Sequence, residues 1–240
     1  MTDAISVSVA IMAHPSRAEM VKDLLARLDV PATVVWDEKQ DRHDTGVRSL
    51  EAFDPDCTHH MVIQDDAVPC RDLVAGVTKA LERVPTGHPL SCYIGKVKPF
   101  AREVDKIVAR AHDGVSFIRM AGIYWGPCIV APIADLPELT RWFRNAQGIK
   151  NYDRRTSRWF ERQRRECWYT WPPLVDHRGD ESLTHRHTSR RTAHRALGPE
   201  RSAMKLDWSG EVLSLDNAKQ MDEQRQRAAE KAKRRAKARA

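Results

Sequence analysis

The sequence lacks an apolar run long enough to cross a membrane, and it lacks the start of a secretory signal. No uncharged apolar stretch reaches the roughly 18 residues that a membrane helix needs. The segment Met1 to Ser6 has no positively charged region and passes directly into a strand-like pattern. We therefore expect no membrane span and no signal peptide, and a cytoplasmic location.

Cysteine is scarce and scattered. The five cysteines are an odd number, and no two of them form a C-x-x-C motif. The H-E-x-x-H arrangement of a zinc helix is missing as well, although His177, His185, His187 and His194 share one polar segment. We therefore expect neither a disulfide framework nor a cysteine zinc site, and we interpret the thiols as reduced.

The chain has no visible internal repeat. It also has no helix-turn-helix signature, zinc finger or aromatic ladder that would indicate a nucleic-acid-binding module. The charge balance is nevertheless basic, with 40 Lys and Arg against 33 Asp and Glu, for a net charge of +7. Hydrophobic residues make up 41% of the 240 residues, which is enough for a real core. The basic excess favours an acidic partner, namely nucleic acid, nucleotide phosphates or an anionic surface, without choosing among them.

The hydrophobic pattern predicts an α/β protein. Residues 5–12 and 33–36 have strand character, and residues 18–28 between them have apolar positions at helical spacing. Strand, helix and strand in this order predict a parallel βαβ unit with a right-handed crossover. Further strands are expected at 61–63, 90–94, 116–119, 123–125, 128–131 and 167–171, and further helices at 47–53, 71–84, 102–111, 136–143 and 151–166.

Two adjacent aspartates follow the buried-strand pattern of residues 61–63. In open α/β sheets, ligands bind beyond the carboxyl ends of the strands, where Asp65 and Asp66 would lie. Carboxylate oxygens are ligands suited to Mg²⁺ or Mn²⁺, and such an ion binds phosphate oxygens in turn. The alternative is that these aspartates only cap the next helix, because Asp is a favoured N-cap residue.

The arginine-rich segment 151–166 also has two interpretations. Its arginines form either a basic helix that binds an acidic partner or, for most of them, a solvated face. A late segment from Trp171 to His177, of sequence WPPLVDH, follows it.

Three features together carry a resemblance to a known family: the turn from Ala13 to Arg17, the Gln64-Asp65-Asp66 motif, and the segment from Trp171 to His177. This arrangement resembles small glycosyltransferases of the GT-A fold, particularly compact ones from bacteriophage genomes, over roughly residues 5–195. The resemblance implies a GT-A-like, Rossmann-like sheet, mostly parallel and flanked by helices. It also implies a glycosyltransferase domain at 1–197, followed by a connector and basic C-terminal helical tail at 198–240.

The resemblance also assigns roles to individual residues. Asp66 and His177 match the metal ligands, and Asp153 matches a catalytic base, although its surroundings depart from the usual Glu-Asp pair and an N-cap role is the simpler alternative. The positions expected to hold the nucleotide sugar are Ala13, His14, Arg17, Asp37, Arg48 and Asp65.

The implied activity is a metal-dependent transfer, with Mn²⁺ or Mg²⁺, of a sugar from a nucleotide-sugar donor to a hydroxyl group. UDP-sugars are the leading donors, and the acceptor is a phage virion protein, a glycan or a hydroxylated DNA base. A phage-encoded enzyme would act in the cytoplasm of the host cell. Inversion and retention of stereochemistry both remain open, as do two alternatives: a nucleotidyltransferase-like enzyme, and a non-catalytic nucleic-acid-binding protein that uses the basic clusters.

Overall fold

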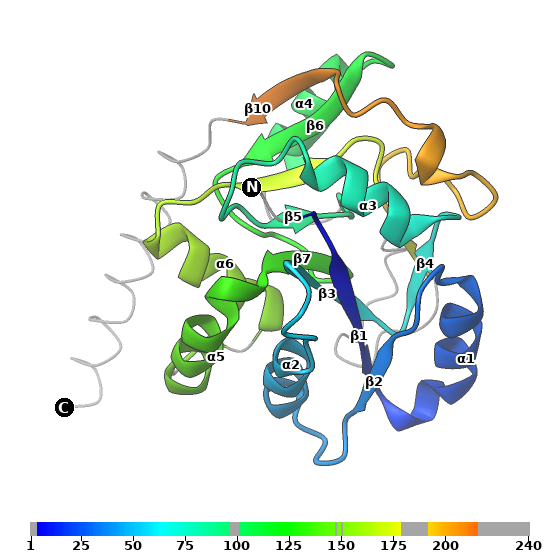
Figure 1. The fold of residues 1–240 in the computed structure, drawn as a ribbon. Coiled ribbons are helices and arrows are strands. Elements are labelled where there is room, and N and C mark those ends of the chain that lie inside the picture. The colour runs from blue at the N-terminus through cyan, green and yellow to red at the C-terminus, as the bar shows by residue number, and fades with distance from the viewer. Residues whose placement is uncertain (1–3, 97–100, 147, 150, 179–191, 216–240) are drawn as a thin grey trace.

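The computed structural model describes residues 4–96, 101–146, 148–149, 151–178 and 192–215 (Figure 1). The strands are β1 (Val7–Ala13), β2 (Thr33–Trp36), β3 (His59–Gln64), β4 (Ala67–Pro69), β5 (Leu90–Ser91), β6 (Val115–Met120), β7 (Cys128–Pro132), β8 (Cys167–Thr170), β9 (Val175–His177) and β10 (Glu211–Leu215). The helices are α1 (Ala18–Arg27), α2 (Arg42–Glu51), α3 (Leu73–Leu81), α4 (Ala101–Arg110), α5 (Leu136–Asn145) and α6 (Tyr152–Arg162).

Eight strands form one central sheet in the order β10-β6-β8-β5-β7-β3-β1-β2, and β4 and β9 form a separate pair. At one end of the sheet, β1 pairs in parallel with both β2 and β3. The expected strand–helix–strand unit is therefore present, because α1 connects β1 to β2. The predicted fold class, an α/β sheet with a mostly parallel arrangement and flanking helices, is confirmed.

Three strands of the sheet, β6, β7 and β10, run opposite to the other five, and β7 lies in the middle of the sheet. Strand β7 runs against β3 on one side, with Ile63 opposite Cys128, and against β5 on the other. The start of β7 therefore lies beside the end of β3. The Gly126-Pro127 turn that leads into β7 consequently reaches the edge where β1, β2 and β3 end.

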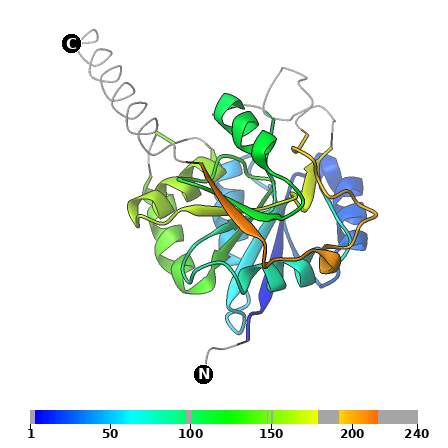
Figure 2. The same ribbon diagram turned by 90° about the horizontal axis from the view of Figure 1, so that it is seen from above.

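Two hydrophobic clusters cover the two faces of the sheet. The alternation of side chains along a strand divides β3 between them, since Val62 belongs to one cluster and Met61 and Ile63 belong to the other. Helices α2, α4, α5 and α6 pack on the first face, and α1 and α3 pack on the second. Figures 1 and 2 show this layered arrangement.

Several element boundaries differ from the sequence prediction. Helix α2 begins at Arg42 instead of residue 47, because the Asp41 carboxylate accepts the His43 N–H and caps the helix. Residues 123–125, expected to be a strand, lie outside every strand. Residues 211–215, within the expected connector, form β10 and pair with β6 at the edge of the sheet. The expected C-terminal helical tail beyond residue 215 lies outside the described residues.

Within the described part of the chain, none of the helices combines the length and the apolar character that a membrane crossing requires.

Candidate active site at the carboxyl ends of β1, β2 and β3

The acidic pair forms a turn between two strands. Asp65 and Asp66 follow β3, and β4 begins directly after them at Ala67. Helix α3 starts only at Leu73, with Asp72 in its cap position, so the two aspartates do not cap it. Both are buried, at 5% and 7% exposure. Burying a carboxylate is costly unless it is paired with an opposite charge or a hydrogen-bond donor, so both aspartates require partners.

Arg17 is the principal partner of the acidic pair. Its Nη1 atom lies 2.7 Å from Oδ1 of Asp65 and 2.6 Å from Oδ2 of Asp66. Burial raises the pKa of Asp65, while the His14 N–H and the Arg17 guanidinium oppose this rise. Burial would lower the pKa of Arg17, but the charges of Asp66 and Asp65 outweigh it and raise the pKa above its usual value.

The turn after β1 lies against the same aspartates. The backbone N–H of His14 donates to Oδ2 of Asp65 at 2.8 Å. The carbonyl oxygen of Ala13 accepts the N–H of Asp37 at 2.8 Å, which brings the end of β2 to this point. Four positions expected to hold a nucleotide sugar, Ala13, His14, Arg17 and Asp37, are thus gathered around Asp65.

The pairing of β4 with β9 places His177 next to the acidic pair, although it lies more than 100 residues later in the sequence. In this pair Ala67 is opposite His177, and the Arg178 N–H donates to the Asp66 carbonyl at 2.9 Å. The Nε2 atom of His177 lies 3.3 Å from Oδ2 of Asp66. Its Nδ1 lies 2.6 Å from the Arg178 carbonyl, which accepts only, so Nδ1 carries the proton and Nε2 faces Asp66 as a lone pair when the ring is neutral.

The acidic turn has the chemistry of a divalent-cation site. The Oδ1 atom of Asp66 is buried and has no hydrogen-bond partner among the described residues. Carboxylate oxygens and an imidazole nitrogen form a donor set that suits Mn²⁺ or Mg²⁺, and such ions often take one or two protein ligands together with substrate phosphates. A ready cluster of three or more His, Cys, Asp or Glu ligands is not found within the described ranges. The residues present fit an ion that is completed by its substrate.

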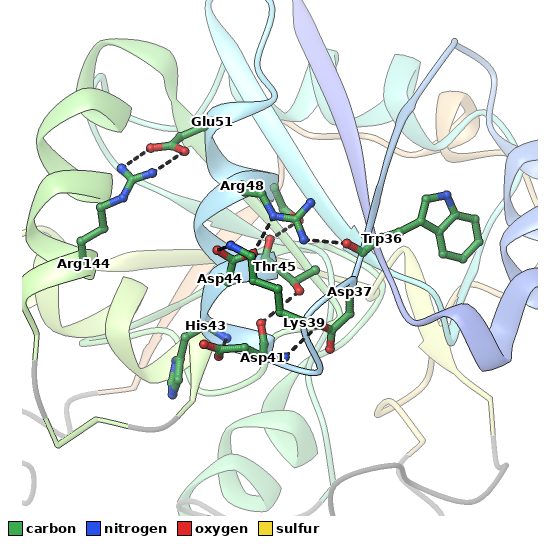
Figure 3. Close-up of polar contacts among 11 residues, drawn as sticks. Trp36, Asp37, Lys39, Asp41, His43, Asp44, Thr45, Arg48, Glu51 and Arg144 are labelled. Carbon is green, nitrogen blue, oxygen red and sulfur yellow. Dashed lines mark hydrogen bonds and ion pairs between the residues drawn. The ribbon is translucent and has the colours of Figure 1, made fainter.

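Arg48 lies in α2 and contacts the end of β2. Its guanidinium donates to the Trp36 carbonyl at 2.6 Å and to the Asp44 carboxylate at 2.8 Å (Figure 3). The Asp37 carboxylate accepts the N–H of Asp41 at 2.9 Å in the same loop. Asp37 thus lies in the polar loop between β2 and α2, whereas the described contacts of Arg48 are with the end of β2 and the first turn of α2, and not with Asp65 or Asp66.

Asp153 reaches the edge of the site from α6. It lies two residues after the N-cap residue Asn151, so it does not itself cap the helix, although its Oδ1 accepts the Arg154 N–H at 2.7 Å. A Cβ placed on Gly126 would be 3.0 Å from Nε2 of Gln64 and 3.4 Å from Cβ of Asp153. These distances place Asp153 beside the first residue of the Gln64-Asp65-Asp66 motif. Burial raises the pKa of Asp153 to about 6, against the opposing effects of the Arg154 N–H and nearby arginines.

Gly126 is a site position that was not predicted from the sequence. The segment from Gly122 to Gly126 is held by buried side chains: the Tyr169 hydroxyl donates to the Gly122 carbonyl at 2.9 Å and accepts the Tyr124 N–H at 3.0 Å. The Ser157 hydroxyl accepts the Ile123 N–H at 2.9 Å. The Gly126-Pro127 pair directly before a strand indicates a turn in the sequence. Its position beside Gln64 follows only from the antiparallel pairing of β7 with β3.

A separate hollow lies between α5 and α6, with a volume of about 290 Å³. Its lining combines two indole rings, two guanidinium groups, two amides and one carboxylate: Trp142, Trp159, Arg141, Arg162, Asn145, Gln163 and Glu138. The hollow is distinct from the acidic turn and adds an aromatic, net basic surface to the second half of the chain.

Comparison with known proteins gives little beyond this geometry. No protein-family model and no curated protein sequence matches the chain. Among solved structures, the chain is similar to an Asp-to-Asn mutant of Drosophila β-1,4-galactosyltransferase 7 in complex with manganese, UDP-galactose and xylobiose. The TM-score is 0.41 at 11% identity, over 90% of this chain and 79% of that one. The function must therefore be argued from the residues of this chain.

Proposed function

We propose that the protein is a metal-dependent glycosyltransferase that moves a sugar from a nucleotide-sugar donor to a hydroxyl acceptor. The observation that carries this proposal is the convergence of Asp65, Asp66, Arg17 and His177 at one strand edge, from three separate segments. Buried carboxylates with an arginine and an imidazole are suited to a metal-bound diphosphate. The same edge carries Asp153, a carboxylate whose pKa of about 6 suits a base near neutral pH.

In this proposal the donor lies across the ends of β1, β2 and β3. Backbone and side-chain groups of Ala13, His14, Arg17, Asp37, Arg48 and Asp65 hold the nucleotide. Asp66 and His177 hold Mn²⁺ or Mg²⁺, and the bound ion supplies neutralisation of the charge on the diphosphate leaving group. Arg17 adds charge-assisted hydrogen bonds to phosphate oxygens.

The acceptor lies on the Gly126 side of the edge, where Asp153 accepts the proton of the attacking hydroxyl. A side chain at position 126 would crowd Nε2 of Gln64 at 3.0 Å and Cβ of Asp153 at 3.4 Å, so the glycine lets the backbone pass close to both residues. Asp153 is needed as a base if the sugar configuration is inverted in a single step, and a retaining reaction would not need it.

The donor can be identified by calorimetric titration with UDP, GDP, UDP-sugars and other nucleotides, with and without Mn²⁺. We expect one nucleotide to bind only in the presence of metal, and this binding to be lost in Asp66→Asn. The exposed Asp113→Asn is the matched control, because it removes a carboxylate far along the chain from the acidic turn. Absence of binding by any nucleotide to the folded wild-type protein would contradict the proposal.

The acceptor is proposed to be a virion protein, a glycan or a hydroxylated base in DNA, with DNA favoured by the net charge of +7 and the basic hollow between α5 and α6. Binding that neutralises DNA phosphates releases counterions and therefore weakens steeply with salt. Arg141→Ala and Arg162→Ala should reduce both the DNA affinity and its salt dependence. Affinity that is flat between 50 and 200 mM salt (a range in which about 10³-fold losses are typical of multi-phosphate contacts) would exclude DNA.

A nucleotidyltransferase is the second enzymatic candidate, because it would use the same carboxylates and metal. It predicts turnover of a nucleoside triphosphate without release of a sugar, so a product assay with nucleoside triphosphates and nucleotide sugars separates the two. The third candidate, a non-catalytic nucleic-acid-binding protein, predicts that Asp65→Asn and Asp66→Asn leave nucleic-acid affinity unchanged.

A further inference from the structure

The Arg17 guanidinium occupies the position in which a cation would neutralise the acidic turn. A single nitrogen, Nη1, contacts Oδ1 of Asp65 and Oδ2 of Asp66, at 2.7 and 2.6 Å. The side chains of all three residues are at most 10% exposed. Oδ2 of Asp66 is also the oxygen that faces Nε2 of His177. Arg17 and His177 therefore converge on one oxygen atom.

This arrangement has an electrostatic reason in the protein without metal. Two buried carboxylates on adjacent residues repel each other, and each is expensive to bury without an opposite charge. The guanidinium supplies one positive charge and hydrogen-bond donors to both carboxylates. A divalent cation on the same oxygens would be repelled by a guanidinium in contact with them. The two cations are thus alternatives.

We infer that Arg17 is an internal counter-ion that competes with the divalent metal for Asp65 and Asp66, so that metal binding displaces its guanidinium from the acidic turn. The inference rests on the metal dependence of the proposed function. Arg17 ends the short 3-10 turn Pro15–Arg17 that precedes α1, and its backbone N–H is fixed by the His14 carbonyl at 2.9 Å. Its long side chain can rotate without unfolding that turn. Once displaced, the guanidinium is next to the edge where a diphosphate would lie.

The consequence is that Arg17 lowers the affinity of the metal-free protein for metal. Removing the guanidinium leaves Asp65 and Asp66 with an unneutralised charge that a divalent ion can satisfy. Affinity for Mn²⁺ in the absence of nucleotide should therefore rise when Arg17 is shortened, whereas a residue that only stabilised the site geometry would weaken metal binding when it was removed.

The test is direct titration with Mn²⁺ alone, followed by the electron paramagnetic resonance signal of the free ion. We expect Arg17→Ala to bind Mn²⁺ at least tenfold more tightly than the wild type. Arg17→Lys should be intermediate, because an ammonium group retains the charge but lacks the planar fork of the guanidinium. Asp66→Asn should lose Mn²⁺ binding in either background.

The matched control is Arg144→Ala, which removes another arginine from a carboxylate. Arg144 pairs with Glu51 at 2.5 and 2.8 Å between α5 and α2, away from Asp65 and Asp66 (Figure 3). Its Mn²⁺ affinity should equal that of the wild type. If Arg17→Ala does not fold without metal, as circular dichroism would show, Arg17→Lys decides the question, and we expect it to bind at least threefold more tightly than the wild type.

An unchanged or weaker Mn²⁺ affinity in the folded Arg17 variants would overturn the inference, as would the absence of Mn²⁺ binding in every variant. Because no nucleotide is present, this result is independent of the donor titration. Tighter Mn²⁺ binding in Arg17→Ala together with no nucleotide-sugar turnover by the wild-type protein would retain the counter-ion role and reject the glycosyltransferase.

Discussion

Asp153 differs from the other carboxylates of the site because it lies against Gln64 and Gly126 instead of Arg17. Burial raises its pKa to about 6, so it is largely ionised at pH 7 and becomes protonated as the pH falls through 6. If it is the base, the rate of sugar transfer should decline below about pH 6. Asp153→Asn should lower kcat by about 10²- to 10⁴-fold and abolish this acidic limb.

The measurement is the pH dependence of kcat/KM, with the donor identified by titration, for the wild type, Asp153→Asn and the exposed control Asp113→Asn. Full activity in Asp153→Asn would show that Asp153 is not the base and that its carboxylate only contributes to the first turn of α6.

His60 is a buried residue outside the site whose titration should affect stability. It is 1% exposed, and its Nε2 and Nδ1 atoms lie 2.8 Å from the Ser49 carbonyl and the Ser8 hydroxyl. Since a carbonyl only accepts, Nε2 carries the proton of the neutral ring. Burial lowers the pKa of His60 below its usual value. The unfolded chain therefore takes up this proton first, so the free energy of unfolding should fall as the pH decreases from about 7 to 5.

His60→Gln should reduce this pH dependence. It should also lower the free energy of unfolding at pH 7 by about 1–3 kcal/mol, because glutamine replaces two buried hydrogen bonds imperfectly. Urea unfolding at several pH values between 5 and 7.5 measures both effects. A slope in the variant equal to that of the wild type would contradict the assignment, with the partly buried His59 as the next residue to examine.

At the residue scale, candidate site residues could be predicted from the sequence where they directly follow a recognisable strand. The acidic turn follows an apolar strand directly, so position in the fold could be predicted from the pattern of residues 61–66 alone. The contact of His177 with Asp66 rests on the β4–β9 pairing, and it was expected only from the family resemblance. The Arg17 ion pairs could not be predicted, because a side chain of that length has many possible partners.

At the scale of elements, the connection from Gly122 to Gly126 is held in part by the buried hydroxyl of Tyr169. The Tyr169 side chain is fully buried, and its hydroxyl satisfies two backbone groups, the Gly122 carbonyl and the Tyr124 N–H. Tyr169→Phe would remove these two buried hydrogen bonds, and should destabilise the protein by about 1–3 kcal/mol.

Tyr152→Phe provides the matched control for this prediction. The Tyr152 hydroxyl is also buried, but within the described residues it has no hydrogen-bond partner. Its removal should be neutral or slightly stabilising. Thermal unfolding of both variants tests the pair, and equal losses would show that the two hydroxyls are equivalent and that Tyr169 does not hold the connection.

The elements also show why the second half of the fold was harder to predict. The first unit alternates strand and helix, so its parallel pairing follows from chain order. Strand β7 instead enters between β3 and β5 in the opposite direction, and its apolar sequence, CIVAP, is compatible with either direction. Gly126 and Asp153 could not be placed beside Gln64 until that direction was known.

At the scale of the whole molecule, β10 closes one edge of the sheet with residues that the sequence had assigned to a connector. Leu213 is 4% exposed in the cluster that includes α4, and β10 pairs along β6. A chain that ends at residue 210 would expose the β6 edge, and should melt at a lower temperature and self-associate. The loss of one buried leucine alone corresponds to about 1.5–3 kcal/mol.

The comparison is with a chain that ends at residue 215, so that the difference isolates the five residues of β10. Melting temperature and size-exclusion profile are the measurements. Identical behaviour of the two shortened chains would show that the strand contributes nothing to the stability of the sheet.

The antiparallel insertion of β7 also has a consequence for how such a protein can diversify. The groups proposed to hold the donor come mainly from residues 13–66, whereas Gly126 and Asp153 come from a later stretch that enters the sheet in the reverse direction. Exchange of residues 122–163 between relatives would replace the proposed acceptor side and keep the proposed donor side intact. The proposed donor edge could in this way be recombined with new acceptors, and the crossover points for such chimeric proteins would lie at residues 122 and 163.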